Sequence, residues 1–314
     1  MGRYIDLDGV RTWYDERGTG DPLVLLHGGL SDSRDFTGNL DALAGHYRTF
    51  LPDRRGHGRT PDVVGPFTGD ALAGDVIAFL EQVVGGPARL VGYSAGATVA
   101  LHVAVRRPDL VERLVSISGA FDADGLLLRP SADGPMPPQI VAAYAEVSPD
   151  GAEHFPIILD KVVEAAAQPG LTLSDLTSVP CRALVLSGDD DLVSLDHTLA
   201  LYRALPDSAL AIVPEASHLL MHEKPAEVTA LVAAFLIGDP VPTLMPIRRA
   251  GAPDEFPARL GKVALRELAV HGYTSWAQLA AVTPAQLLAI HGVGPKAIRI
   301  LTEELAERNL SFAG

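Results

Sequence analysis

Ser94 is the residue whose surroundings most clearly suggest chemistry. It lies in the pentapeptide GYSAG at 92–96, after an apolar run at 88–91 that is typical of a buried strand and before an apolar helical segment at 98–105. Glycines two residues before and after a serine permit a sharp strand-to-helix turn that exposes a nucleophilic hydroxyl. The backbone amide of Ala95 would then point to the place where an oxyanion forms.

A nucleophilic serine needs a histidine to accept its proton, and that histidine needs a carboxylate to fix its tautomer. Two later segments each join an apolar strand pattern to such a residue, because 184–191 ends in three aspartates and 211–218 ends in a histidine. The chain order of serine, acid and histidine fits a site at the carboxyl ends of parallel strands. The candidates are Ser94, one of the aspartates at 189–191, and His218 or the nearby His222.

Alternating strand and helix patterns surround these motifs and predict an α/β fold. A hairpin is expected at the start of the chain, because an Asp-Gly pair separates two strand patterns. The expected strands are 4–7, 11–16, 23–26, 47–52, 88–91, 111–118, 183–186 and 209–213, and the expected helices are 70–84, 98–105, 195–205 and 226–237. This alternation predicts a mostly parallel, doubly wound sheet with helices on both faces.

The pattern is interrupted at 121–178, a proline-containing stretch with helical patches at 139–147 and 155–167. We expect a helical cap inserted between two strands of the sheet. Its apolar side chains favour a substrate with a modest hydrophobic acyl or alcohol group. The residues behind that expectation are Leu126, Leu127, Leu128, Met136, Ile157, Ile158 and Leu159.

The sequence changes in character near residue 238. A proline-rich linker is expected at 238–256, followed by four short helices in 257–314. Residues 240–314 contain eight Lys/Arg and six Asp/Glu and so carry a charge of +2, which leaves −16 on the part before them. Such an acidic part is not expected to bind nucleic acid by itself, since phosphate would be repelled.

With these motifs in place, residues 1–237 resemble a serine-dependent α/β-hydrolase. The matching motifs are His27-Gly28-Gly29, Asp53-x-Arg55-Gly56-His57-Gly58, Gly92-x-Ser94-x-Gly96, Gly188-x-x-Asp191 and Ser217-His218. The resemblance implies a catalytic domain at 1–237 in which Ser94 is the nucleophile, Asp191 the acid and His218 the base. It favours Asp191 over Asp189 as the acid.

The same resemblance implies an oxyanion hole made by the backbone amides of Gly29 and Ala95. His27 and His57 are expected to buttress loops, and Asp53 and Arg55 to hold the loop after their strand by local hydrogen bonds. Cys181 is the only cysteine and lies in an apolar run, so we expect a buried thiol rather than a nucleophile.

Residues 257–314 resemble a helix-hairpin-helix domain like the C-terminal domain of bacterial RNA polymerase α subunits. The resemblance rests on the pattern Leu-x-x-Ile-x-Gly-x-Gly-x-x-Ala, in which the glycines are Gly292 and Gly294 and Lys296 follows. It implies a phosphate site formed by these three residues at a helix N-terminus, and weak, non-specific contact with DNA. The alternative is a module that docks on protein or only packs.

These observations together predict a serine hydrolase that forms an acyl-enzyme with a small, mainly apolar carboxylic ester, thioester or lactone. Members of the family it resembles that open epoxides or displace halide have an aspartate at this turn, so Ser94 argues against both reactions. Two alternatives use the same residues, namely hydrolysis of a C–C bond and haloperoxidase-like perhydrolysis. A third is a non-catalytic ligand sensor tethered through 257–314.

No metal or organic cofactor is expected, because acyl transfer to a serine needs none. The three aspartates in a row lack the spacing of a calcium loop. No apolar run reaches the roughly 18 residues of a membrane span, and the first residues lack the apolar segment of a signal peptide. Together with the single cysteine, this predicts a cytoplasmic protein whose main partner is a small molecule.

Overall fold

The computed structural model describes residues 2–131, 134, 136–238, 256–271, 273, 275–308 and 310–313. The chain divides into two compact units, Met1–Asp239 and Pro240–Gly314. Of the linker predicted at 238–256, all but the two end residues lie outside the described residues. Each unit is considered by itself below.

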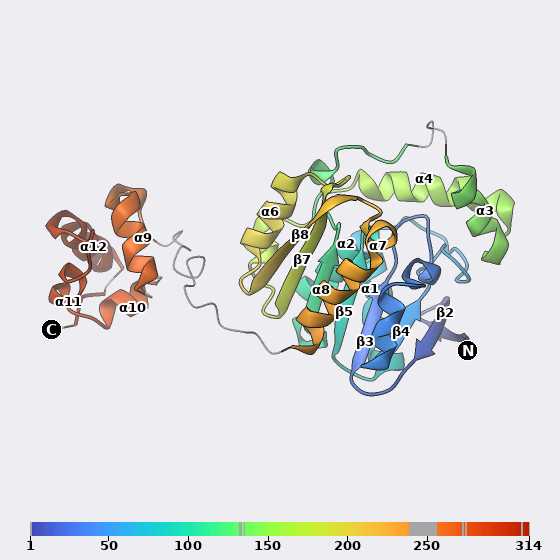
Figure 1. Ribbon diagram of the computed structural model, residues 1–314, viewed down its shortest axis with the longest axis horizontal. Coiled ribbons are helices and arrows are strands. Elements are labelled where there is room, and N and C mark those ends of the chain that lie inside the picture. The colour runs from blue at the N-terminus through green and yellow to red at the C-terminus, as the bar shows by residue number, and fades with distance from the viewer. Residues whose placement is uncertain are drawn as a thin grey trace. The chain divides into compact units, whose positions relative to one another are not determined.

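The first unit is built on an eight-stranded sheet with strand order β1-β2-β4-β3-β5-β6-β7-β8 (Figure 1). The strands are β1 (Arg3–Leu7), β2 (Val10–Arg17), β3 (Pro22–Leu26), β4 (Arg48–Pro52), β5 (Ala88–Tyr93), β6 (Val111–Ile117), β7 (Arg182–Asp190) and β8 (Ser208–Ser217). The pairs β1–β2 and β2–β4 are antiparallel, and every other neighbouring pair is parallel. The predicted α/β class and mostly parallel sheet are confirmed.

Helices cover both faces of this sheet. They are α1 (Gly69–Phe79), α2 (Ala95–Arg106), α6 (Leu195–Ala204), α7 (Leu220–Glu223) and α8 (Pro225–Ile237). The helix expected over 70–84 changes at Leu80 into a π-helical segment that runs to Val84, and Gly85 ends it with φ 88°. Its wider turn was not visible in the apolar spacing of the sequence.

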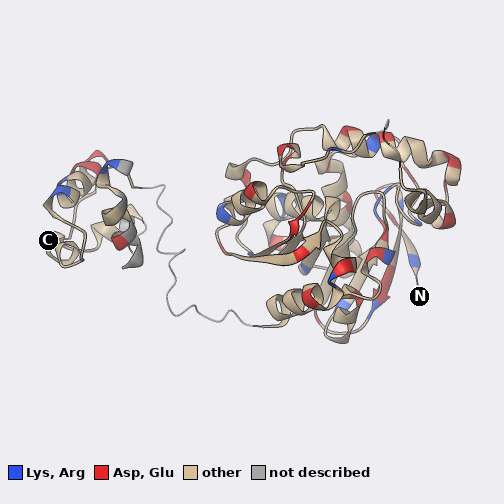
Figure 2. Cartoon of the chain, turned by 45° about the horizontal axis from the view of Figure 1, so that its top comes forward, with Lys and Arg blue, Asp and Glu red and all other residues tan. Residues whose placement is uncertain are grey.

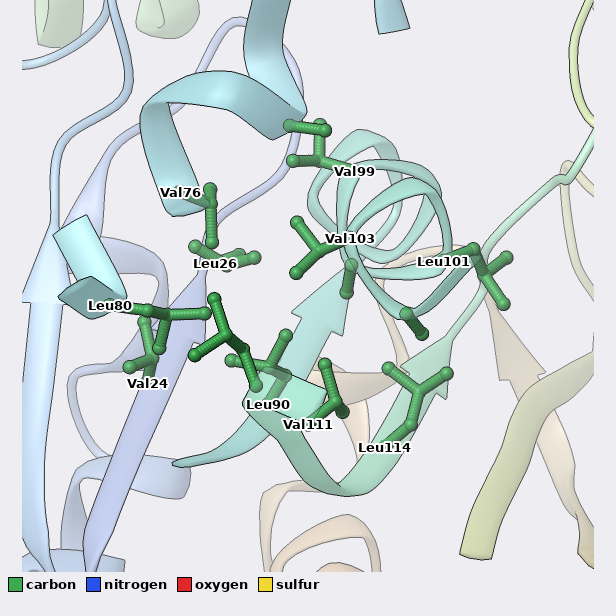
Figure 3. Close-up of a cluster of buried hydrophobic side chains, with 14 of the residues drawn as sticks. Val24, Leu26, Val76, Leu80, Leu90, Val99, Leu101, Val103, Val111 and Leu114 are labelled. Carbon is green, nitrogen blue, oxygen red and sulfur yellow. The ribbon is translucent and has the colours of Figure 1, made fainter. Parts of the chain in front are cut away.

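The alternation of side chains along β3 explains the two layers. Val24 and Leu26 pack with α1 and α2 on one face, as Figure 3 shows, with Val76 and Val103 among their neighbours. Leu23 and Leu25 belong to the cluster on the other face, which includes side chains of α7 and α8. Successive residues of a strand point to opposite faces, so a continuous apolar run supplies both cores.

An insertion between β6 and β7 forms a helical cap, drawn above the sheet in Figure 1. Its cap helices are α3 (Pro138–Val147) and α4 (Phe155–Ala166), while the short α5 (Leu173–Leu176) packs through Leu176 in the core beside α2. Phe155, Ile158 and Leu159 of α4 are buried in a cluster with Tyr144 of α3 and with Phe67, which lies in the loop between β4 and α1.

Acidic side chains are spread over several elements of the first unit (Figure 2).

The described residues of the second unit form helices α9 (Lys262–Val270), α10 (Trp276–Ala280), α11 (Pro284–Leu288) and α12 (Pro295–Glu307). Capping boxes start two of them, with Ser275 and Gln278 at α10 and Thr283 and Gln286 at α11. Leu268, Leu279, Leu287, Leu301 and Leu305 are fully buried in their shared core. Whether this arrangement is the predicted helix-hairpin-helix domain stays a prediction.

Candidate active site

Ser94 lies in the tight turn between β5 and α2. Its backbone has φ 52° and ψ −121°, which is a strained conformation for a residue with a side chain. A Cβ atom on Gly92 would lie 2.4 Å from the carbonyl oxygen of Gly96, and one on Gly96 would lie 2.1 Å from that of Leu26. Both positions therefore require glycine, and the turn holds the Ser94 hydroxyl at the carboxyl end of β5.

His218 follows directly after β8 and contacts Ser94 and Asp191. Its Nε2 lies 2.9 Å from Ser94 Oγ, and its Nδ1 lies 2.7 Å from Asp191 Oδ1. The Tyr93 hydroxyl donates a hydrogen bond of 2.8 Å to the His218 carbonyl, and the two rings lie 5.5 Å apart. With the proton on Nδ1 facing the carboxylate, Nε2 is free to accept the hydroxyl proton of Ser94.

Asp191 is buried, and its carboxylate accepts hydrogen bonds beyond the one from His218. The other donors are the hydroxyls of Ser118 and Ser187 (the latter at 2.9 Å) and the backbone N–H groups of Gly188 at 3.2 Å and Val193 at 3.1 Å. Burial by itself would raise the pKa of Asp191, but hydrogen bonds from His218 and Ser118 outweigh it and hold this pKa at about 2. The carboxylate is therefore ionised at neutral pH.

The structure separates these residues from their alternatives. Asp189 accepts a hydrogen bond of 3.1 Å from the backbone N–H of Ala216 and so fixes the neighbouring β8 end. His222 is exposed on α7, where its ring forms no hydrogen bond among the described residues. Ser94, His218 and Asp191 are thus the three predicted residues that come together, and we refer to them as the triad.

The backbone N–H groups of Gly29 and Ala95 lie near Ser94 and are unpaired within the described part of the chain. A Cβ atom built on Gly29 would lie 3.6 Å from the Cβ of Ala95, so the loop after β3 and the first turn of α2 are neighbours. Among the described residues, neither amide donates a hydrogen bond to a backbone or side-chain acceptor. Unpaired amides at a helix N-terminus can stabilise negative charge on a bound group.

Ser118 and Ser187 were not singled out by the sequence analysis. Ser118 follows β6 and has φ 50°, while Ser187 lies within β7, and both side chains are buried. The available signal was weak, since each is only a polar residue at the carboxyl end of an apolar strand. Their contact with Asp191 arises from the register of β6 and β7, which a sequence pattern does not specify.

The cap approaches the Gly29 amide with a residue that the sequence analysis did not name. Val162 of α4 would be 4.0 Å from a Cβ atom on Gly29, which places this helix beside the loop after β3. In contrast, Leu127, Leu128 and Ile157 are 66%, 73% and 47% exposed. These three side chains extend toward solvent, so the expectation of a modest hydrophobic substrate group gains no support from them and stays a prediction.

The loop motifs play the structural parts expected of them. Asp53 is buried and accepts hydrogen bonds from the backbone N–H groups of Ser33 at 2.9 Å and Arg59 at 2.8 Å. Burial raises the pKa of Asp53 and lowers the pKa of His57 to about 3, so this histidine stays neutral. Burial also raises the pKa of Cys181 to about 11, which makes its thiol a poor nucleophile.

The residues of the predicted phosphate site lie before and within the first turn of α12. Gly292 has φ 88°, and a Cβ atom there would lie 2.7 Å from Val263 and 3.1 Å from Glu267. Packing against α9 therefore already requires this glycine, and the nearby Glu267 carries the wrong charge for phosphate. Gly294 caps α12 and Lys296 is exposed. A phosphate site at Gly292, Gly294 and Lys296 stays a prediction.

The described part of the chain has neither a candidate metal site nor a candidate membrane span. No group of three or more His, Cys, Asp or Glu side chains there could hold a metal ion. None of its helices is both long enough and apolar enough to cross a membrane.

Known proteins resemble this chain over about three quarters of its length. A curated relative from Acinetobacter baylyi, (E)-2-((N-methylformamido)methylene)succinate hydrolase, is 25% identical over 75% of this chain and 98% of its own length. A putative non-heme bromoperoxidase from Mycobacterium tuberculosis is 28% identical over 71% of this chain and 96% of its own. The enol-lactonase of Burkholderia xenovorans, 24% identical, shares the fold with a TM-score of 0.62, over 75% of this chain and all of that one.

The family comparison covers most of the first unit. The model of the alpha/beta hydrolase family matches residues 23–231, which include the triad and the whole cap. The chain therefore belongs to the alpha/beta hydrolase family and is a hydrolase.

Proposed function

We propose that this protein is a serine hydrolase that forms an acyl-enzyme on Ser94 with a small, mainly apolar carboxylic ester, thioester or lactone. The observation that carries this proposal is the unbroken contact from Ser94 Oγ to His218 Nε2 at 2.9 Å and from His218 Nδ1 to Asp191 Oδ1 at 2.7 Å. These contacts suit transfer of the hydroxyl proton to the imidazole as the oxygen attacks a carbonyl carbon.

In the proposed mechanism, the Ser94 oxygen bonds to the carbonyl carbon while His218 takes its proton. The carbonyl oxygen becomes an oxyanion, which the amides of Gly29 and Ala95 stabilise by hydrogen bonds. His218 then returns the proton to the leaving oxygen or sulfur, leaving an acyl group on Ser94. A water molecule, deprotonated by His218, releases the acid and restores the serine.

Asp191 serves this cycle as a fixed negative charge. It stabilises the imidazolium that forms twice per turnover and holds the tautomer that each step needs. Its pKa of about 2 means that it does not take up the proton itself at neutral pH.

A fluorophosphonate probe and a chain-length series of p-nitrophenyl esters test the proposal. We expect covalent labelling of Ser94, hydrolysis that is fastest for short or medium acyl chains, and loss of both in Ser94→Ala. Folded wild-type protein that is neither labelled nor active would instead favour the non-catalytic ligand sensor.

The bromoperoxidase name of the M. tuberculosis relative favours perhydrolysis as a second candidate. In that reaction hydrogen peroxide replaces water in deacylation and releases a peracid, with the same triad. Adding peroxide and bromide to the ester assay, with an indicator that is brominated by the oxidised halide, would reveal it. C–C bond hydrolysis is the remaining alternative, which labelling of Ser94 without turnover of any simple ester would favour.

Contact of the second unit with DNA or protein stays a prediction. A mobility-shift assay of the full chain with duplex DNA at low salt, with Lys296→Gln as the paired variant, tests it. Binding that weakens in the variant and with added salt would agree with phosphate contact. No shift at low salt would remove the idea.

A further inference from the structure

The loop after β3 accepts a hydrogen bond from a buried arginine that has no part in the proposed mechanism. Arg54 follows the strand β4 and is only 7% exposed, and its Nη2 donates a hydrogen bond of 2.7 Å to the carbonyl oxygen of Gly28. That carbonyl belongs to the same peptide group as the N–H of Gly29. In a planar trans peptide the C=O and N–H point in opposite directions, so whatever fixes the carbonyl also fixes the amide.

Arg54 does not act alone on this carbonyl. Gly28 O also accepts a hydrogen bond of 2.8 Å from His27 Nδ1 and one of 3.1 Å from the Ser31 hydroxyl. The backbone N–H of Arg54 donates to His27 Nε2 at 3.0 Å, which leaves the histidine proton on Nδ1, facing Gly28. Burial and the charge of Arg54 hold the pKa of His27 well below its usual range, so this ring is neutral.

The charge of Arg54 is poorly compensated for a buried group. Among the described residues no carboxylate forms an ion pair with its guanidinium, and its Nε is buried without a partner. Asp35 and Asp75 act on it only from a distance, and burial lowers its pKa to about 10, which still leaves it charged at neutral pH. A buried cation of this kind is costly for folding. Among the described residues, the backbone carbonyl of Gly28 is the only group that accepts a hydrogen bond from the Arg54 side chain.

We propose that Arg54 is a positioning residue that orients and polarises the Gly28–Gly29 peptide, and so strengthens the hydrogen bond from the Gly29 amide to the oxyanion. A charged donor on the carbonyl draws electron density from the peptide nitrogen and makes its N–H a stronger donor. The effect is largest when the oxyanion forms, so it acts on the transition state more than on substrate binding. This inference rests on the proposed function.

The test compares Arg54→Met with wild type in ester hydrolysis and in inhibition by phenylboronic acid, which forms a tetrahedral anion on a nucleophilic serine. We expect kcat to fall by at least about tenfold. This loss should be smaller than the roughly 10²–10³-fold loss that follows removal of an oxyanion-hole donor itself. KM should stay within about twofold, and the boronate Ki should rise by a factor matching the loss in kcat. A merely structural role would not couple these two quantities.

Arg55→Met is the matched control, because Arg55 is the next residue and pairs with Asp75 at 2.5 Å without touching Gly28. We expect this variant to lose stability but to keep kcat and the boronate Ki within about twofold. If Arg54→Met does not fold, Arg54→Gln replaces it, since it removes the charge and retains a neutral donor, and the same coupled losses are expected.

Two results would overturn the inference in a wild-type enzyme that is active and labelled at Ser94. One is a variant of Arg54 with unchanged kcat and boronate Ki, and the other is a loss of kcat with an unchanged boronate Ki. Wild-type protein that neither hydrolyses esters nor binds the boronate would contradict the proposed function itself. The two failures are therefore distinguishable.

Discussion

The carboxyl edge of the sheet and the cap hold their side chains in different ways. At the edge, Asp191 is surrounded by hydroxyl and amide donors that come from β6, β7 and the loop after them. The cap is attached by an apolar cluster and by a few ion pairs, such as Lys161 with Asp62 at 2.6 Å. We infer that the chemistry depends on the rigid edge and that the choice of substrate depends on the inserted helices.

The largest effect is expected from Ser94→Ala. Removing the nucleophile should lower kcat for p-nitrophenyl esters by about 10⁵-fold, because both the acyl-enzyme and its general-base step are lost. Steady-state assays on folded protein, checked by circular dichroism, measure this. A variant within a hundredfold of wild type would show that the edge is not where the chemistry occurs.

Asp191→Asn should have the next largest effect. The amide keeps the shape but favours the wrong imidazole tautomer and removes the charge that stabilises imidazolium, so we expect kcat to fall by about 10³–10⁴-fold. Asp189→Asn is the matched control two residues away. It should stay within about threefold, since Asp189 is hydrogen-bonded to backbone N–H groups, among them that of Ala216 at 3.1 Å, rather than to His218.

Stability at low pH should also report on the edge. The pKa of Asp191 is about 2 in the folded protein against 3.8 as its ordinary value, so the unfolded chain takes up a proton first as the pH falls. The contribution of this group, about 2 kcal/mol, is therefore complete above about pH 5 and is lost between about pH 4 and 2. Urea unfolding of wild type and Asp191→Asn over this range measures it. Parallel curves for the two proteins would contradict the assignment.

The smallest effect is expected from the cap, in Lys161→Met. Lys161 donates to both oxygens of Asp62 and to the Val63 carbonyl, and its neighbour Val162 lies beside Gly29. Loosening this contact should raise KM by about fivefold and leave kcat within about twofold. The control is Arg129→Met, whose exposed ion pair with Asp124 should contribute almost nothing. A fall in kcat with an unchanged KM would contradict the assignment of substrate binding to the cap and of the chemistry to the edge of the sheet.

Sequence patterns were most informative where local chemistry restricts the residue type. The glycines around Ser94 are required because a Cβ atom at either would lie 2.1 to 2.4 Å from a backbone oxygen, so the motif shows in the sequence. Apolar runs also specified the parallel strands, since both faces of β3 are buried. The catalytic roles of Ser94, Asp191 and His218 remain predictions, although their predicted chain order matches residues that the fold brings together.

Other features depend on tertiary contacts that no local pattern records. Ser118 meets Asp191 only because β6 and β7 pair in one register, and Arg54 meets Gly28 only because β3 and β4 are neighbours. The cap gives a second example. Leu127 and Leu128 are as apolar as Ile158, yet they are exposed while Ile158 is buried, and hydrophobicity alone does not tell an exposed cap residue from a buried one.

The most direct test of the account is mass spectrometry of protein quenched during turnover of p-nitrophenyl butyrate. We predict a butyryl group on the peptide that contains Ser94 in wild type and no such group in Ser94→Ala. Continued hydrolysis by wild type with Ser94 always unmodified, or with the acyl group on another residue, would contradict it.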